Sequence, residues 1–112
     1  MSADDPIDRE VLARLDFGEP PGEMLALLVG TFLEHAPANV TAMVDGARVG
    51  DVEAVTLAAH SLKSSARQFG AMHLGELCEA IEAAGHGGAV DADAVVAAAA
   101  EFERARAALA DG

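Results

Sequence analysis

Residues 52–69, V-E-A-V-T-L-A-A-H-S-L-K-S-S-A-R-Q-F, carry the pattern that decides the fold. Their apolar residues recur at steps of three and four, which is the spacing of one buried helical face. Asp51 stands where it can cap the first turn, and Gly70 follows the last apolar residue, as glycine often does after a helix. The stretch therefore predicts an amphipathic helix over about residues 51–69. Its buried stripe consists of Val52, Val55, Ala59, Leu62, Ala66 and Phe69.

Similar helical patterns lie on both sides of this stretch. They are separated by breaks rich in glycine and proline at residues 17–21, 46–50 and 85–88. Pro37 falls inside the second pattern, where we expect a kink or a local irregularity. The expected helices span about residues 6–15, 21–45, 51–69, 72–84 and 91–109.

These elements predict an all-α fold. No segment alternates between apolar and polar residues with a period of two, so we expect no strand. Four amphipathic helices with short connections form an antiparallel four-helix bundle. A short N-terminal helix, with Asp5 as its cap and Pro6 in its first position, is expected to close one end of the bundle. We expect a single domain over residues 1–112.

The composition restricts the classes of function. The chain is 52% hydrophobic, which is enough for a core, and its formal net charge is −12, which disfavours binding to nucleic acid or to an anionic membrane. A single cysteine cannot form an internal disulfide, and no apolar run reaches the roughly 18 residues of a membrane span. The N-terminus lacks the apolar run of a signal peptide. We therefore expect a cytoplasmic monomer.

One stretch differs from the acidic remainder of the chain. No Asp or Glu occurs between residues 53 and 76, and this stretch contains the only lysine. A cationic, hydroxyl-bearing patch around a histidine suits a phosphoryl group. At about 100° per residue, four polar side chains share one narrow wedge, well away from the apolar stripe: His60, Lys63, Ser64 and Arg67.

Three short motifs in and after this stretch resemble a known family signature. They are H-S-L-K-S-S-A at residues 60–66, F-G-A at residues 69–71 and L-C-E-A-I-E at residues 77–82. Together they closely resemble the signature of the histidine phosphotransfer (HPt) domain, which reads H-x-L-K-G-S, then an apolar residue with G-A, then L-C-x-x-apolar-E. The expected number and lengths of the helices are also similar to those of this family.

The resemblance implies a carrier that moves phosphate between the aspartates of response-regulator receiver domains, or takes it from a hybrid or sensor histidine kinase. Such a carrier has no ATP site, cofactor or metal of its own. Carried over by position, His60 is the phospho-acceptor, Lys63 is the neighbouring cation, and Glu82 hydrogen-bonds the histidine. Arg67 would join Lys63 in stabilising the phosphoryl group. Ser64 stands where the family usually has glycine, and we expect a receiver still to dock beside it.

Residue counting supports the pairing of His60 with Glu82. His60 lies about ten residues before the turn at Gly70 and Glu82 about eleven after it, so the two stand at similar heights on adjacent helices at about 1.5 Å per residue. We expect the Glu82 carboxylate to accept a hydrogen bond from Nδ1 of His60. Nε2 would then point outward as the nucleophile, beside exposed Lys63.

Two other functions remain open. One is a helical-bundle module that is not phosphorylated and that docks and inhibits a receiver or a histidine kinase. The other is a metal-binding bundle through His60, His73 and Cys78, although their spacing matches no standard metal site. We interpret the remaining candidates as packing or surface groups: Cys78 as buried, His35, His73 and His86 as structural or solvent-exposed, and Glu76 and Glu79 as solvated.

Overall fold

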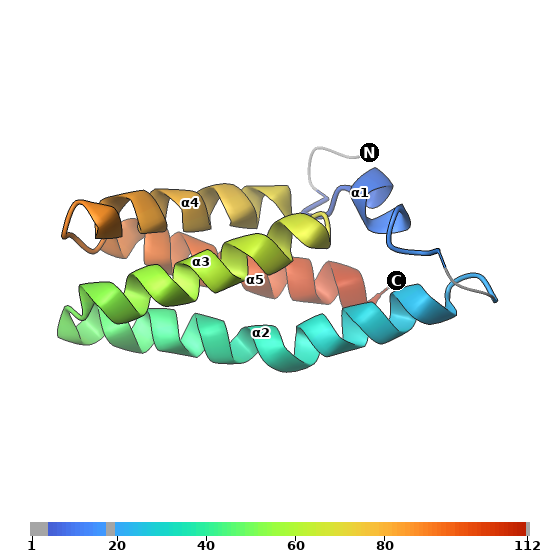
Figure 1. Cartoon of the computed structure of the whole chain (residues 1–112), viewed down its shortest axis with the longest axis horizontal. Helices are drawn as coiled ribbons and strands as arrows, with labels where there is room; N and C mark the ends of the chain where they lie inside the picture. Colours follow the sequence, from blue (N-terminus) through green and yellow to red (C-terminus); the bar gives the residue numbers. More distant parts are fainter. Residues whose placement is uncertain (1–4, 18–19, 112) are drawn as a thin grey trace.

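The computed structural model describes residues 5–17 and 20–111, and helices make up most of residues 20–111 (Figure 1). No strand occurs in these ranges, so the expectation of an all-α fold is confirmed. Gly18 and residues 1–4 lie outside these ranges. The expected break at residues 17–21 rests partly on Gly18, and the absence of a signal-peptide pattern rests partly on residues 1–4. The helices are α1 (Arg9–Ala13), α2 (Glu23–Val49), α3 (Val52–Gln68), α4 (Met72–His86) and α5 (Ala92–Ala110).

The four long helices form the bundle, and α1 lies at one end of it (Figure 1). α3 packs against both α2 and α4, and α5 packs against the same two helices from behind. None of the described helices combines the length and the low polarity needed to cross a membrane. The apolar stripe of α3 faces the core, where Phe32 of α2 stacks on Phe69 with ring centroids 4.8 Å apart. Val55, Ala59, Leu62, Ala66 and Phe69 are all buried.

The N-terminal helix is shorter than predicted, and its cap is a different residue. Asp8, rather than Asp5, accepts hydrogen bonds from two backbone N–H groups of the first turn. Ile7 is fully buried, and the Asp8 N–H donates to the carbonyl oxygen of Gly70 at 2.7 Å. Gly70 has a φ of 83°, and a Cβ there would lie 2.5 Å from the Asp8 carbonyl oxygen. Residues 6–8 lie outside the helix, and the hydrogen bond of Asp8 anchors them on the turn between α3 and α4.

Two of the long helices continue past their predicted ends. Residues 46–49 were expected in a turn but belong to α2. The helix continues because Gly46 is buried against Val55 of α3. A Cβ at Gly46 would lie 2.9 Å from Cγ2 of Val55. α2 ends at Gly50, which has a φ of 71°. α4 likewise continues through Gly85. α2 also runs through Pro37, so the irregularity that we expected there does not divide the helix.

Candidate functional site

His60 lies partway along α3 on the face opposite the core. Its side chain is 58% exposed, whereas Ala59 and Leu62 on the same helix are fully buried. The separation follows from the helical repeat, because His60 falls between the steps of the apolar stripe. The expectation that His60 is exposed on this helix is confirmed.

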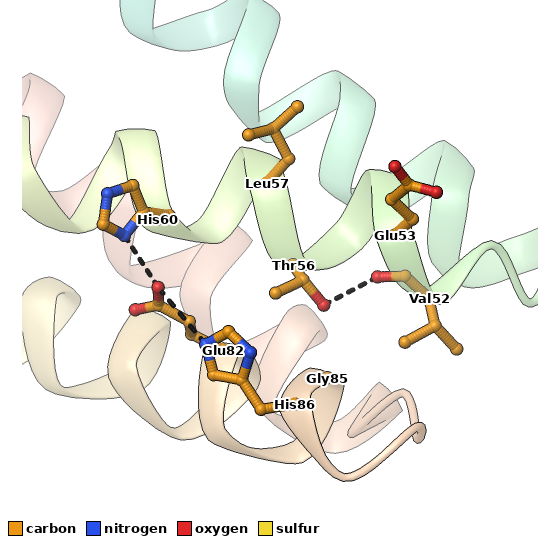
Figure 2. A pocket seen from close by; sticks show the side chains of 8 residues that line it. All are labelled: Val52, Glu53, Thr56, Leu57, His60, Glu82, Gly85 and His86. Carbon is orange, nitrogen blue, oxygen red and sulfur yellow. Dashed lines mark hydrogen bonds and ion pairs between the residues drawn. The ribbon is translucent and has the colours of Figure 1, made fainter.

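Glu82 reaches His60 from the neighbouring helix α4. The Nδ1 atom of His60 and the Oε2 atom of Glu82 are 2.7 Å apart, so the predicted contact is confirmed (Figure 2). A carboxylate accepts hydrogen bonds, so the tautomer that fits this contact carries its proton on Nδ1. Among residues 5–17 and 20–111, none bonds the Nε2 atom of His60.

Lys63 binds the same carboxylate as His60. Its ammonium donates a hydrogen bond to Oε1 of Glu82, while His60 occupies Oε2. The side chain of Lys63 is only 18% exposed and that of Glu82 only 12% exposed. The expectation of an exposed lysine was therefore wrong, because the lysine stem packs along the helix interface while its charged end is paired.

The electrostatics of this cluster favour an ionised Glu82. The hydrogen bond from Lys63 is the largest influence and lowers the pKa of the Glu82 carboxyl below its ordinary value. The hydrogen bond from His60 adds to this lowering, while desolvation opposes it. Glu82 is thus a permanent anion between two nitrogen donors at neutral pH.

Small residues on α4 allow the two helices to approach at this site. Gly75 faces α3, and a Cβ there would lie 2.9 Å from Cγ of Arg67. Gly85 also faces α3, and a Cβ there would lie only 1.8 Å from Oγ1 of Thr56. Glu82 lies between these two glycines along α4, so both close approaches help to hold its carboxylate within reach of His60.

Arg67 and Ser64 share the helical face of His60 but take no part in the cluster around Glu82. The guanidinium of Arg67 pairs with Glu79 of α4, with Nη2 and Oε2 3.2 Å apart. Glu79 is exposed as expected, but it has this partner across the helix interface. Ser64 is exposed one turn after His60. The structure thus brings His60, Lys63 and Glu82 together and places Arg67 in a separate ion pair.

A groove of about 530 Å³ opens beside His60 between α3 and α4. Leu57 lies on its rim, one turn before His60, with 67% of its surface exposed. The groove is lined by Val52, Glu53, Thr56, Leu57, His60, Glu82, Gly85 and His86 (Figure 2).

His86 also reaches this site, although we interpreted it only as a structural or exposed residue. It is exposed, and its Nε2 lies 3.8 Å from Oε2 of Glu82. The signal that could have revealed this proximity is the spacing of four residues between Glu82 and His86 on one helix.

The residues of the metal-binding alternative do not converge. His73 lies beside Glu76, with Nδ1 and Oε2 3.6 Å apart, and Cys78 is buried in the core. Burial, with a smaller contribution from Glu82, raises the pKa of the Cys78 thiol to about 12, so it stays protonated. No three histidine, cysteine or carboxylate side chains in the described ranges are grouped as metal ligands.

Comparisons with known proteins give two matches. The protein-family model described as "Hpt domain" matches residues 27–111. Among solved structures, the chain is similar to histidine-containing phosphotransfer protein B (HptB) from Pseudomonas aeruginosa PAO1, with a TM-score of 0.85. The two are 24% identical over 98% of this chain and 95% of that one, so this likeness concerns the fold. A search of curated proteins gave no match.

Proposed function

This chain belongs to the Hpt domain family, and on that premise we propose that His60 accepts a phosphoryl group and relays it to or from the aspartate of a response-regulator receiver domain. A hybrid or sensor histidine kinase is the proposed source of the phosphate in the relay. The chain acts as a carrier without ATP-dependent activity, and we propose that it works as a monomer in the cytoplasm.

One observation carries the proposal: the two ring nitrogens of His60 have different surroundings. Nδ1 is held by Glu82 at 2.7 Å, and the exposed side chain leaves Nε2 accessible to a partner. In the tautomer that fits the Glu82 contact, Nε2 carries a lone pair and no proton. It can therefore act as a nucleophile without a separate base.

The chemical step follows from this arrangement. The Nε2 lone pair attacks the phosphorus of an aspartyl phosphate, and a nitrogen–phosphorus bond forms. The bond between phosphorus and the aspartate oxygen breaks, and its electron pair remains on the aspartate carboxylate. The ring becomes positively charged, and the Glu82 carboxylate on Nδ1 offsets that charge. The reverse sequence returns the phosphoryl group to an aspartate.

Lys63 and Arg67 are the proposed sources of positive charge for the phosphoryl oxygens. The ammonium of Lys63 lies on the carboxylate that holds His60, so it is part of the same cluster. Arg67 would have to leave Glu79 to reach the phosphoryl group. That exchange is inexpensive, because an ion pair between partly exposed side chains contributes only about 0–1 kcal/mol.

The surface around His60 is suited to docking a folded partner. Leu57 presents an apolar side chain one turn before His60, and Ser64 presents only a small side chain one turn after it. Buried apolar area at a contact favours association, while small neighbours leave the imidazole accessible. We propose that the receiver covers this line of residues and the adjoining groove.

The test is transfer from a phosphorylated receiver domain to the purified chain. We expect an acid-labile, base-stable label on the wild type, and complete loss of it in His60→Gln. His35→Gln and His73→Gln are matched controls that should label normally. A label that persists in His60→Gln would move the acceptor elsewhere.

The same experiment separates the carrier from a docking inhibitor. An inhibitor would bind the receiver and stay unlabelled, so binding without any label on the wild-type chain would favour that alternative.

A further inference from the structure

We infer that His86 is a positioning residue of this site, acting on His60 through the carboxylate oxygen that both imidazoles approach. This inference rests on the proposed role of His60 as the acceptor. His86 is absent from the three motifs that resemble the family signature, and it follows the last of them by four residues on α4.

The imidazoles of His60 and His86 both approach the same carboxylate oxygen of Glu82. Oε2 of Glu82 lies 2.7 Å from Nδ1 of His60 and 3.8 Å from Nε2 of His86. Figure 2 shows the carboxylate between the two rings, with His60 reaching it from α3 and His86 from the last turn of α4. The other oxygen accepts a hydrogen bond from Lys63. Oε2 accepts a hydrogen bond from His60, and His86 lies within ion-pair distance of the same oxygen.

The surroundings of His86 contain few other charges. Glu53 and His60 of α3 line the same groove, and Glu82 is the acid of α4 there. From α5, Asp91 caps its own helix through the Ala94 N–H, and Asp93 lines no part of the groove. His86 lies in the last turn of α4, where exposed carbonyl groups favour a cation.

Protonation of His86 and protonation of His60 therefore oppose each other, because both rings approach the same carboxylate oxygen. When His86 is protonated, it attracts Oε2 of Glu82 more strongly and weakens the hold of that oxygen on Nδ1 of His60, which disfavours a second proton on the His60 ring. In this proposal, a positive charge on His86 favours the neutral, nucleophilic form of the His60 ring. This effect reaches His60 through the position and charge of Glu82, without contact between His86 and the phosphoryl group.

Ring nitrogen NMR of the unphosphorylated protein between pH 5 and pH 8.5 tests this inference. In His86→Gln, we expect the midpoint of the His60 titration to rise by roughly 0.2–0.5 pH unit. In His86→Lys, which carries a fixed charge, the midpoint should fall below that of the wild type. The two variants therefore move the same signal in opposite directions, which loss of folding would not do.

Two controls define the route of the effect. His73→Gln removes an exposed histidine beside an acid on the same helix, and it should leave the His60 titration unchanged. In a Glu82→Gln background, the shift caused by His86→Gln should shrink, because the neutral amide no longer attracts a protonated His86. A full-sized shift in that background, or an unchanged midpoint in both His86 variants, would overturn the inference.

A second measurement links the coupling to transfer. The rate of phosphate acceptance in His86→Gln should be about twofold lower than in wild type near pH 6 and equal to it near pH 8.5. The NMR result does not depend on phosphorylation. Failure of the proposed function would therefore appear as labelling of His60→Gln, whereas failure of this inference would appear as an unmoved titration.

Discussion

The His73–Glu76 pair and the His60–Glu82 pair differ in how they are built. His73 and Glu76 lie three residues apart on α4, with 3.6 Å between their nearest atoms, and Glu76 is 73% exposed. His60 and Glu82 come from different helices, lie 2.7 Å apart, and the carboxylate is almost covered. The local pair is visible in the sequence but is weak, whereas the interhelical pair depends on packing and is firmly held.

Burial and a third partner distinguish the His60–Glu82 pair from the surface pair. Lys63 completes the interhelical pair, and its hydrogen bond is the main reason why the pKa of Glu82 is lowered. A carboxylate held in this way keeps its charge and its orientation, so it can fix the tautomer of an imidazole. A surface pair of similar composition is screened by water.

The largest difference between the two pairs is expected when each loses its acid. Glu82→Ala should slow transfer by about 10- to 100-fold, because His60 loses the group that orients its ring. Glu76→Ala should change the rate by less than about twofold, since the exposed pair around it contributes little. Single-turnover transfer from a phosphorylated receiver measures both. Equal transfer rates in the two variants would show that the interhelical pair matters no more for transfer than the surface pair.

The His60–Glu82 pair also depends on the close approach of α3 and α4, which the surface pair does not need. Gly85→Ala should destabilise the fold by about 1–3 kcal/mol, because its Cβ would overlap Thr56 and push α4 from α3. Gly30→Ala in α2 is the matched control, since nothing lies within 4 Å of its Cβ. That control should gain about 0.5–1 kcal/mol from helix propensity. Urea unfolding measures both, and a neutral Gly85→Ala would show that the helices can separate freely.

Removal of Lys63 should leave the interhelical pair of His60 and Glu82 without its third partner. In Lys63→Ala, we expect transfer to slow by about two- to tenfold, the value of one hydrogen bond. The pKa of Glu82 should rise towards its ordinary value, because its largest stabilising partner is lost. Carboxyl carbon NMR gives that pKa.

The sign of the accompanying stability change follows from linkage. A lowered pKa stabilises the fold above the pH at which the unfolded carboxyl titrates, and this stabilisation is lost as the pH falls through the lower folded value. The variant should therefore show a weaker loss of stability on acidification than the wild type. An unmoved Glu82 pKa would contradict the pairing.

The smallest effect is expected at Ser64, which touches neither pair. Ser64→Gly should leave transfer unchanged or slightly faster, because it gives a receiver more room beside His60. The glycine should cost about 0.5–1 kcal/mol of stability within α3. Transfer kinetics and thermal melts test this, and a marked loss of transfer in the folded variant would show that the hydroxyl contacts the partner or the phosphoryl group.

The spacing of apolar residues predicted the five helices, their buried faces and the exposed position of His60, although the ends of α1, α2 and α4 differ from the prediction. These features follow from a repeat of 3.6 residues along one chain segment, so the spacing of Val55, Leu62 and Phe69 fixes where His60 points. The resemblance to the family signature added the acceptor and its acid. The cap of the first helix was predicted wrongly, because Asp8 rather than Asp5 caps α1, and the Asp8 N–H also donates to the Gly70 carbonyl oxygen of a distant turn.

Which charged side chains pair with one another depends on how the helices pack. The pairing of Lys63 with Glu82, the separate pair of Arg67 with Glu79, and the approach of His86 to the shared oxygen all depend on the rotation and separation of α3 and α4. Gly75 and Gly85 set that separation by removing side chains at the points of closest approach. A pattern along one helix cannot report a distance between two helices, because that distance is fixed by the smallest side chains at their contact.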